Sequence, residues 1–185
     1  MPIKITGSDL YRKASKVAQS AEVKKGRSRT KQRIMTWIKV KSAIHGKTCW
    51  KVAFTYGGQL CFHFGRKIAY EHPKLANQFK GEWILNTCGT EWSVQTPSGW
   101  VTSSFDEKAA QSRLKVLEGH RITRFSQLHS WLIVEFGKSF TLFVCPSVRD
   151  TKYDVPYWEL YAPGHLVCSI GQRKTVTCRR SDLLM

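Results

Sequence analysis

The sequence predicts an α+β fold that is mostly antiparallel β, and three observations support this prediction. Short stretches in which apolar and polar residues alternate recur along most of the chain, with turn residues between them. Two pairs of stretches repeat one pattern, which is typical of two tandem copies of a β-rich module. Helix signals are confined to the start and the middle of the chain.

The repeat is clearest in two pairs of stretches. Residues 54–64 and 134–144 share an aromatic residue followed by glycine and then an alternating apolar run. Residues 92–103 and 158–169 align without a gap on a Trp, a Pro, a Val and a Ser. Two such modules are expected to pair as a pseudo-symmetric sandwich or barrel. The first copy is longer because of an insertion at about 66–90, whose role the sequence does not specify.

The expected elements divide the chain into a basic helix with a flexible arm, a first β module, a linking helix and a second β module, at 1–33, 34–103, 104–119 and 120–185. Together, 34–185 are expected to form one compact domain. The linking helix is predicted from a capping-box pattern at Ser104 to Glu107 and a stop at Gly119.

Two segments near the start have their own predictions. Helical spacing of small apolar residues predicts a helix over about 8–23. Alternation of Ile34, Thr36, Ile38 and Val40 with Met35, Trp37, Lys39 and Lys41 predicts the first strand over 34–41. On such a strand, Trp37 would share a face with the two lysines.

Positive charge is concentrated in the first quarter of the chain. The 185 residues carry a net charge of +17, and residues 1–51 hold fourteen basic side chains against two acidic ones. A basic block of this kind is typical of proteins that bind a polyanion, usually nucleic acid. The alternative is a solvated tail that only keeps the protein soluble.

The sequence therefore predicts a non-enzymatic protein that binds DNA or RNA through the phosphate backbone. Basic side chains neutralise phosphates, and a neighbouring Trp can stack on an unpaired base. The predicted nucleic-acid-binding residues are Arg12, Lys13, Lys16, Lys24, Lys25, Arg27, Arg29, Lys31, Arg33, Trp37, Lys39 and Lys41. The alternative is a protein-interaction module, such as an inhibitor, an immunity-type protein or an assembly subunit of a defence system, whose basic arm binds an acidic partner.

Signals for catalysis or cofactor binding are weak. Asp150 and Asp154 form the one pair of carboxylates in a loop-like context that a nuclease could use, and Cys88 is the most exposed candidate nucleophile, with His72 or His120 as a partner. His45, Cys49, Cys61 and His63 could supply a zinc site, but their spacing matches no zinc finger. No phosphate-binding loop or dinucleotide fingerprint occurs, so no cofactor is expected.

Cysteine spacing and hydropathy bear on the cellular compartment. The six cysteines show no C-x-x-C spacing, and no apolar run approaches the length of a membrane span. The sequence thus favours a cytoplasmic protein with reduced thiols that does not enter a membrane.

Overall fold

The structure is a computed structural model, and it describes residues 36–55, 57–129, 131–145, 155–171 and 175–181. By its internal contacts the chain divides into two units, 1–36 and 37–185, and the second unit contains all the elements described below. The helix predicted over about 8–23 and the basic arm that follows it lie outside the described residues.

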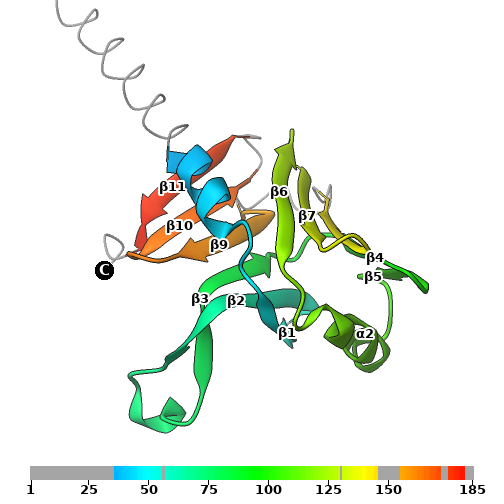
Figure 1. The fold of residues 1–185 in the computed structure, drawn as a ribbon, viewed down its shortest axis with the longest axis horizontal. Helices are drawn as coiled ribbons and strands as arrows, with labels where there is room; N and C mark the ends of the chain where they lie inside the picture. Colours follow the sequence, from blue (N-terminus) through cyan, green and yellow to red (C-terminus); the bar gives the residue numbers. More distant parts are fainter. Residues whose placement is uncertain (1–35, 56, 130, 146–154, 172–174, 182–185) are drawn as a thin grey trace, which may run out of the picture. The chain divides into compact units, whose positions relative to one another are not determined.

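Two antiparallel sheets make up this unit (Figure 1). The six-stranded sheet has the order β1-β2-β3-β9-β10-β11, with bounds Cys49–Thr55, Gln59–Ala69, Phe79–Thr87, Trp158–Ala162, Leu166–Ile170 and Val176–Arg180. The five-stranded sheet has the order β5-β4-β8-β7-β6, with bounds Gly99–Thr102, Trp92–Thr96, Phe140–Val144, Trp131–Phe136 and Ile122–Leu128. The prediction of a mostly antiparallel β fold is confirmed.

Each sheet combines strands from both halves of the chain. In the six-stranded sheet β3 pairs with β9, and in the five-stranded sheet β4 pairs with β8. Residues 54–64 span the β1–β2 hairpin at a sheet edge, whereas 134–144 span the β7–β8 hairpin in the interior of the other sheet. The two similar stretches therefore occupy different positions in their sheets.

The strand predicted over 34–41 is wrong, because residues 37–44 are helical. Trp37, Val40 and Ile44 are buried at helical spacing, whereas Ile38 is 48% exposed. The ring of Trp37 packs between those of Phe125 and Trp158, at centroid distances of 5.9 and 5.6 Å. Burial of this large ring against both sheets favours the helix over the local alternation that suggested a strand.

The linking helix is shorter than the 104–119 predicted. Helix α2 spans Glu107–Leu114, and a 3-10 turn, η2 (Lys115–Leu117), follows it. Its N-cap is Asp106, whose carboxylate accepts hydrogen bonds from the amides of Lys108 and Ala109, so the cap predicted at Ser104 is wrong. Gly119, with φ of 91°, follows as predicted.

Two side chains, Gln111 of α2 and Glu118 just after η2, protect the open edge of the six-stranded sheet. The amide of Val52 in β1 donates to Oε1 of Glu118, 3.1 Å away, and its carbonyl accepts from Nε2 of Gln111, 2.8 Å away. Unpaired groups on an edge strand otherwise invite pairing with another chain. These two side chains therefore satisfy part of the β1 edge.

The two sheets share one hydrophobic core. Phe62 and Phe64 of β2 stack on Phe136 of β7 with ring centroids 6.1 Å apart, and Phe54 of β1 meets Trp92 of β4 at 5.9 Å. Burial of such aromatic side chains supplies much of the driving force for packing the sheets together.

The insertion predicted at about 66–90 is largely the extended β2–β3 hairpin, which projects from the sheet with the 3-10 turn η1 (Pro73–Leu75) near its tip (Figure 1). We call residues 66–80 the arm; almost all of them are exposed or half-buried. A bulge at Gly65, with φ of 73°, marks its start, where the register shifts between Phe64 and Lys67.

Cys168 and Cys178 occupy directly opposite positions on β10 and β11 and form a disulfide. The expectation that all six thiols are reduced is therefore wrong for this pair. Cys49, Cys61, Cys88 and Cys145 are free thiols. Among the described residues, no helix has both the length and the apolar character needed to cross a bilayer.

Candidate nucleic-acid interface on the six-stranded sheet

The residues predicted to bind nucleic acid fall into two groups. Nine of them lie outside the described residues: Arg12, Lys13, Lys16, Lys24, Lys25, Arg27, Arg29, Lys31 and Arg33. The other three lie on the helix over 37–44. Lys39 is exposed there, and Lys41 is half-buried with its Nζ 5.9 Å from the Trp37 ring centroid. Because Trp37 is 8% exposed and packed in the core, its ring does not offer a free face to a base.

One face of the six-stranded sheet is turned away from the core, and we call it the outer face. Directly opposed residues of antiparallel strands project on the same side of a sheet. One row therefore joins Cys61, Asn86, Glu159, Ser169 and Thr177, and the next joins Lys51, His63, Ile84, Tyr161, Val167 and Arg179. The intervening residues Phe62, Leu85, Leu160 and Cys168 belong to the core.

Cys61 and His63 form a neutral hydrogen-bonded pair on this face. The amide of Gly81 donates to Nδ1 of His63, so Nε2 carries the ring proton and donates to Sγ of Cys61, 3.4 Å away. Burial, followed by the charge of Lys51, lowers the His63 pKa to about 4, and burial raises the Cys61 pKa to about 11. At neutral pH the pair thus holds no thiolate and no imidazolium.

Gly81 is required for this arrangement. A Cβ atom at this position would lie 2.5 Å from the carbonyl oxygen of Trp83 and 2.8 Å from the amide nitrogen of Phe64. Only glycine lets the backbone of β3 approach β2 closely enough to reach the His63 ring.

Tyr161 is held on the outer face by its hydroxyl group. That hydroxyl donates to Oε2 of Glu159, 2.7 Å away, and Nη2 of Arg179 lies 3.6 Å from Oε1 of the same carboxylate. Burial and then the hydrogen bond to Glu159 raise the Tyr161 pKa well above its usual value, so the phenol stays neutral. Tyr161 is nevertheless 37% exposed as a residue and lines a surface pocket, described below.

One lysine, Lys80, lines the same pocket as Tyr161, and two more lie on other strands of the sheet. Lys51, from β1, is exposed. Nζ of Lys67, at the base of the arm, lies 5.0 Å from the Trp50 ring centroid, and Nζ of Lys80 lies 5.5 Å from that of Tyr70. A cation–π contact leaves the full positive charge in place, so these ammonium groups can still attract an anion.

Two carboxylates at the base of the arm and on the outer face, Glu82 and Glu159, are already paired, whereas Glu71 within the arm is exposed. Oε2 of Glu82 lies 3.1 Å from Nζ of Lys47, and its Oε1 lies 3.1 Å from Nη2 of Arg66. Glu159 is engaged by Tyr161 and Arg179. The surface formed by the arm and the outer face therefore favours a negatively charged partner.

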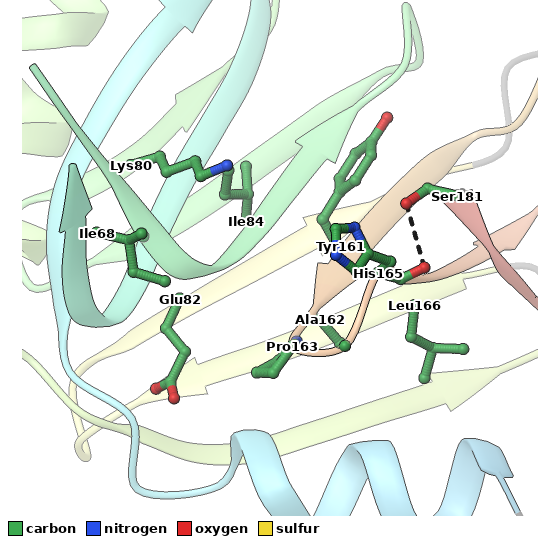
Figure 2. A pocket seen from close by; sticks show the side chains of 12 residues that line it. Ile68, Lys80, Glu82, Ile84, Tyr161, Ala162, Pro163, His165, Leu166 and Ser181 are labelled. Atoms are coloured by element: carbon green, nitrogen blue, oxygen red, sulfur yellow. Dashed lines mark hydrogen bonds between the residues drawn. The ribbon is translucent and has the colours of Figure 1, made fainter. Parts of the chain in front are cut away.

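A pocket of about 280 Å³ opens between the base of the arm and the β9–β10 turn (Figure 2). Its walls include Ile68, Lys80 and Ile84 on one side and Tyr161 and His165 on the other. Ser181, just after β11, donates its hydroxyl and its amide to the carbonyl oxygen of His165. The pocket combines an aromatic ring, aliphatic side chains and a cation.

The structure does not bring the four proposed zinc ligands together. Cys49 is buried in the core, His45 is exposed, and Cys61 and His63 bond to each other. Within the described ranges, no three His, Cys, Asp or Glu side chains are grouped so that they could hold a metal ion.

Of the candidate catalytic residues, those that the structure describes make other contacts. Asp150 and Asp154 lie outside the described residues. Burial, and then the charge of Glu159, raise the Cys88 pKa to about 12, which is opposite to the shift that activates a nucleophile. His72 caps η1 through Nδ1, and the His120 ring packs on Phe140 at 4.7 Å.

Sequence reasoning missed Lys67, Lys80, Tyr161 and His165. One available signal was the insertion at about 66–90, in which Arg66, Lys67 and Lys80 are mixed with aromatic and aliphatic residues. The contribution of Tyr161 depends on β9 pairing with β3, a contact between distant parts of the chain that no local pattern reveals.

The fold and this face define a β-rich protein with a cationic, aromatic sheet surface. Comparisons of the chain with protein-family models, with curated proteins and with solved structures gave no match.

Proposed function

We propose that this protein is a non-enzymatic nucleic-acid-binding protein that grips the phosphate backbone of DNA or RNA. The observation that carries the proposal is the concentration of positive charge, with fourteen basic and two acidic side chains in residues 1–51. The proposed backbone contacts are Arg12, Lys13, Lys16, Lys24, Lys25, Arg27, Arg29, Lys31, Arg33, Lys39 and Lys41. Trp37 is left out because it is a core residue.

Features of the described unit give further support. Lys39, Lys51 and Lys67 are exposed, and the nearby carboxylate of Glu82 is paired within the protein. Such a surface adds long-range attraction for a polyanion without reading its sequence.

The salt dependence of binding tests this function. We expect fluorescence anisotropy to detect binding to labelled single-stranded DNA, duplex DNA and RNA at low salt. If six or more phosphates are neutralised, affinity should fall about 10³-fold or more between about 50 and 200 mM salt. Absent binding at low salt, or binding that ignores salt, would contradict the proposal. The ratio of absorbance at 260 and 280 nm during purification, with and without nuclease and high salt, gives an early check.

The alternative is a protein-interaction module whose basic N-terminal segment, residues 1–33, binds an acidic partner. It is favoured by an exposed apolar pair at the end of the β6–β7 hairpin, in which Leu128 of the edge strand β6 lies opposite Trp131 of β7. Under this alternative, Trp131→Ser should weaken capture of a protein partner, and deletion of 1–33 should abolish it. Recovery of nucleic acid alone in affinity purification would exclude the alternative.

We also propose that the chain holds two tandem copies of one β-rich module, with residues 54–64 matching 134–144 and 92–103 matching 158–169. Each of these four stretches spans a hairpin, namely β1–β2, β7–β8, β4–β5 and β9–β10. Trp92 and Trp158 each begin the first strand of their hairpin, and both are buried. An experimental structure in which the matched hairpins fail to superpose would refute this relationship.

A further inference from the structure

We infer that the pocket between the arm and the β9–β10 turn binds one unpaired nucleobase of a single-stranded nucleic acid, stacked on Tyr161. This inference rests on the proposed function and adds to it the class of nucleic acid and the place where a base is held.

The size of the pocket fits this occupant. At about 280 Å³ it lies just below the range of roughly 300–1,000 Å³ for pockets that hold drug-sized ligands. It therefore suits a single ring system with its substituents. A base inside a duplex is stacked and paired, so only an unpaired base can enter a pocket on the face of a sheet.

The lining of the pocket fits a base in its chemistry (Figure 2). Tyr161 is 37% exposed as a residue, and its hydrogen bond to Glu159 fixes the orientation of the side chain before any ligand arrives. Ile68 and Ile84 offer apolar contacts to the flat faces of a ring, and His165 and Ser181 place polar groups at the margin. Stacking on an aromatic side chain tolerates any base, which matches the lack of a sequence-reading motif.

The surrounding charges fit the phosphates that accompany a base. Lys80 lines the pocket, and Lys67 is exposed on β2, at the base of the arm. Arg179 and Glu159 form an ion pair with each other, and Glu82 is paired with Lys47 and Arg66. A backbone that enters the pocket from the side of the arm would thus meet positive charge.

The test compares Tyr161→Leu with Tyr161→Phe in the full-length protein. The probes are labelled oligodeoxythymidine and oligouridine of about 20 nucleotides and a duplex of equal length, long enough to cross the sheet. Tyr161→Leu should lower affinity for the single strands about 5- to 100-fold, the loss expected for one stacked base, and change duplex affinity less than about twofold. Tyr161→Phe retains the ring but not the hydrogen bond to Glu159, and it should lose much less affinity than Tyr161→Leu.

Matched controls separate this site from general charge effects. Trp100→Leu removes another exposed aromatic ring, on β5 of the other sheet, and should leave single-strand affinity unchanged. Lys80→Gln should weaken single-strand binding, whereas Lys138→Gln, which alters an exposed lysine in the β7–β8 turn, should have a smaller effect. Thermal melts establish that each variant is folded.

A second readout is the fluorescence of 2-aminopurine placed within the single strand. Quenching by the native protein and by Tyr161→Phe, but not by Tyr161→Leu, would support stacking on this ring. An unchanged affinity of folded Tyr161→Leu would overturn the inference while leaving the proposed function intact, and so would equal losses on single strand and duplex. Polyglutamate serves as a further probe. If Tyr161→Leu loses affinity for polyglutamate but not for oligonucleotides, the inference is overturned and the pocket is assigned to acidic peptides. Failure of the native protein to bind any nucleic acid would overturn both proposals.

Discussion

At the scale of single residues, the strongest polar interaction at the base of the arm centres on Glu82. Its side chain is 10% exposed and accepts hydrogen bonds from Lys47, just before β1, and from Arg66, at the start of the arm. Burial alone would raise the Glu82 pKa, but these two partners outweigh it and hold the pKa below its usual value of 4.5.

Glu82→Gln should therefore destabilise the protein at neutral pH by about 1–2 kcal/mol. A carboxylate with a lowered pKa stabilises the fold above the pKa it has in the unfolded chain, and this contribution disappears as the pH falls through the folded-state pKa. The difference between native protein and variant should thus shrink below about pH 4.5. Urea denaturation at neutral and acidic pH measures it.

Glu135→Gln is the matched control for this prediction. Glu135 pairs with Arg124 at 3.2 Å, but its side chain is 35% exposed. A solvated pair of this kind should contribute less than about 1 kcal/mol. Equal losses in the two variants, or a loss at Glu82 that persists unchanged in acid, would show that charge pairing is not what Glu82 supplies.

At the scale of elements, the sequence predicted strands and turns well where alternation coincides with one buried face. Strands β4, β7 and β8 follow this pattern closely, because buried and less buried residues alternate along each of them. It failed at residues 37–44, where two periodicities coexist. Alternation over 34–41 fits a strand, while Trp37, Val40 and Ile44 fit a helix, and only the packing partners of Trp37 distinguish them.

Two substitutions in this helix separate the alternatives. A strand with Ile34, Thr36, Ile38 and Val40 facing inward would make Ile38 a core residue and leave Trp37 outside. In the helix, Trp37→Ala should destabilise the protein by about 3–5 kcal/mol, and Ile38→Ala by less than about 1 kcal/mol. Denaturation curves of both variants provide the measurement, and the reverse order of losses would contradict the helix.

At the scale of the whole molecule, the features that the sequence could not predict are those that depend on contacts between distant parts of the chain. The exchange that pairs β3 with β9 and β4 with β8 brings together residues that are 46 to 77 positions apart in the sequence. The row Cys61, Asn86, Glu159 and the setting of Tyr161 exist only because of that exchange. The disulfide between Cys168 and Cys178 also depends on strand register, since Cys spacing alone allows many pairings. The candidate pocket therefore could not be predicted from local sequence patterns. The basic residues of the arm over 66–80 could have been.

The division of the chain into two units leads to a prediction about the charge-rich start. In the described part of the chain, the hydrophobic core runs from Trp37 to Ile170, with partly buried residues up to Cys178 packed against it. Deletion of residues 1–33 removes none of these contacts, so the remaining chain should keep a cooperative thermal transition within a few degrees of the full-length protein.

The same deletion removes nine of the proposed phosphate contacts. The salt dependence of nucleic-acid binding should then become much shallower, because fewer counterions are released. Calorimetry and anisotropy on one preparation measure both quantities. A truncated chain that unfolds at low temperature would show that the first unit is needed for folding. If the truncated chain folds and binds nucleic acid with unchanged salt dependence, the phosphate contacts instead lie on the arm over 66–80 and on the outer face.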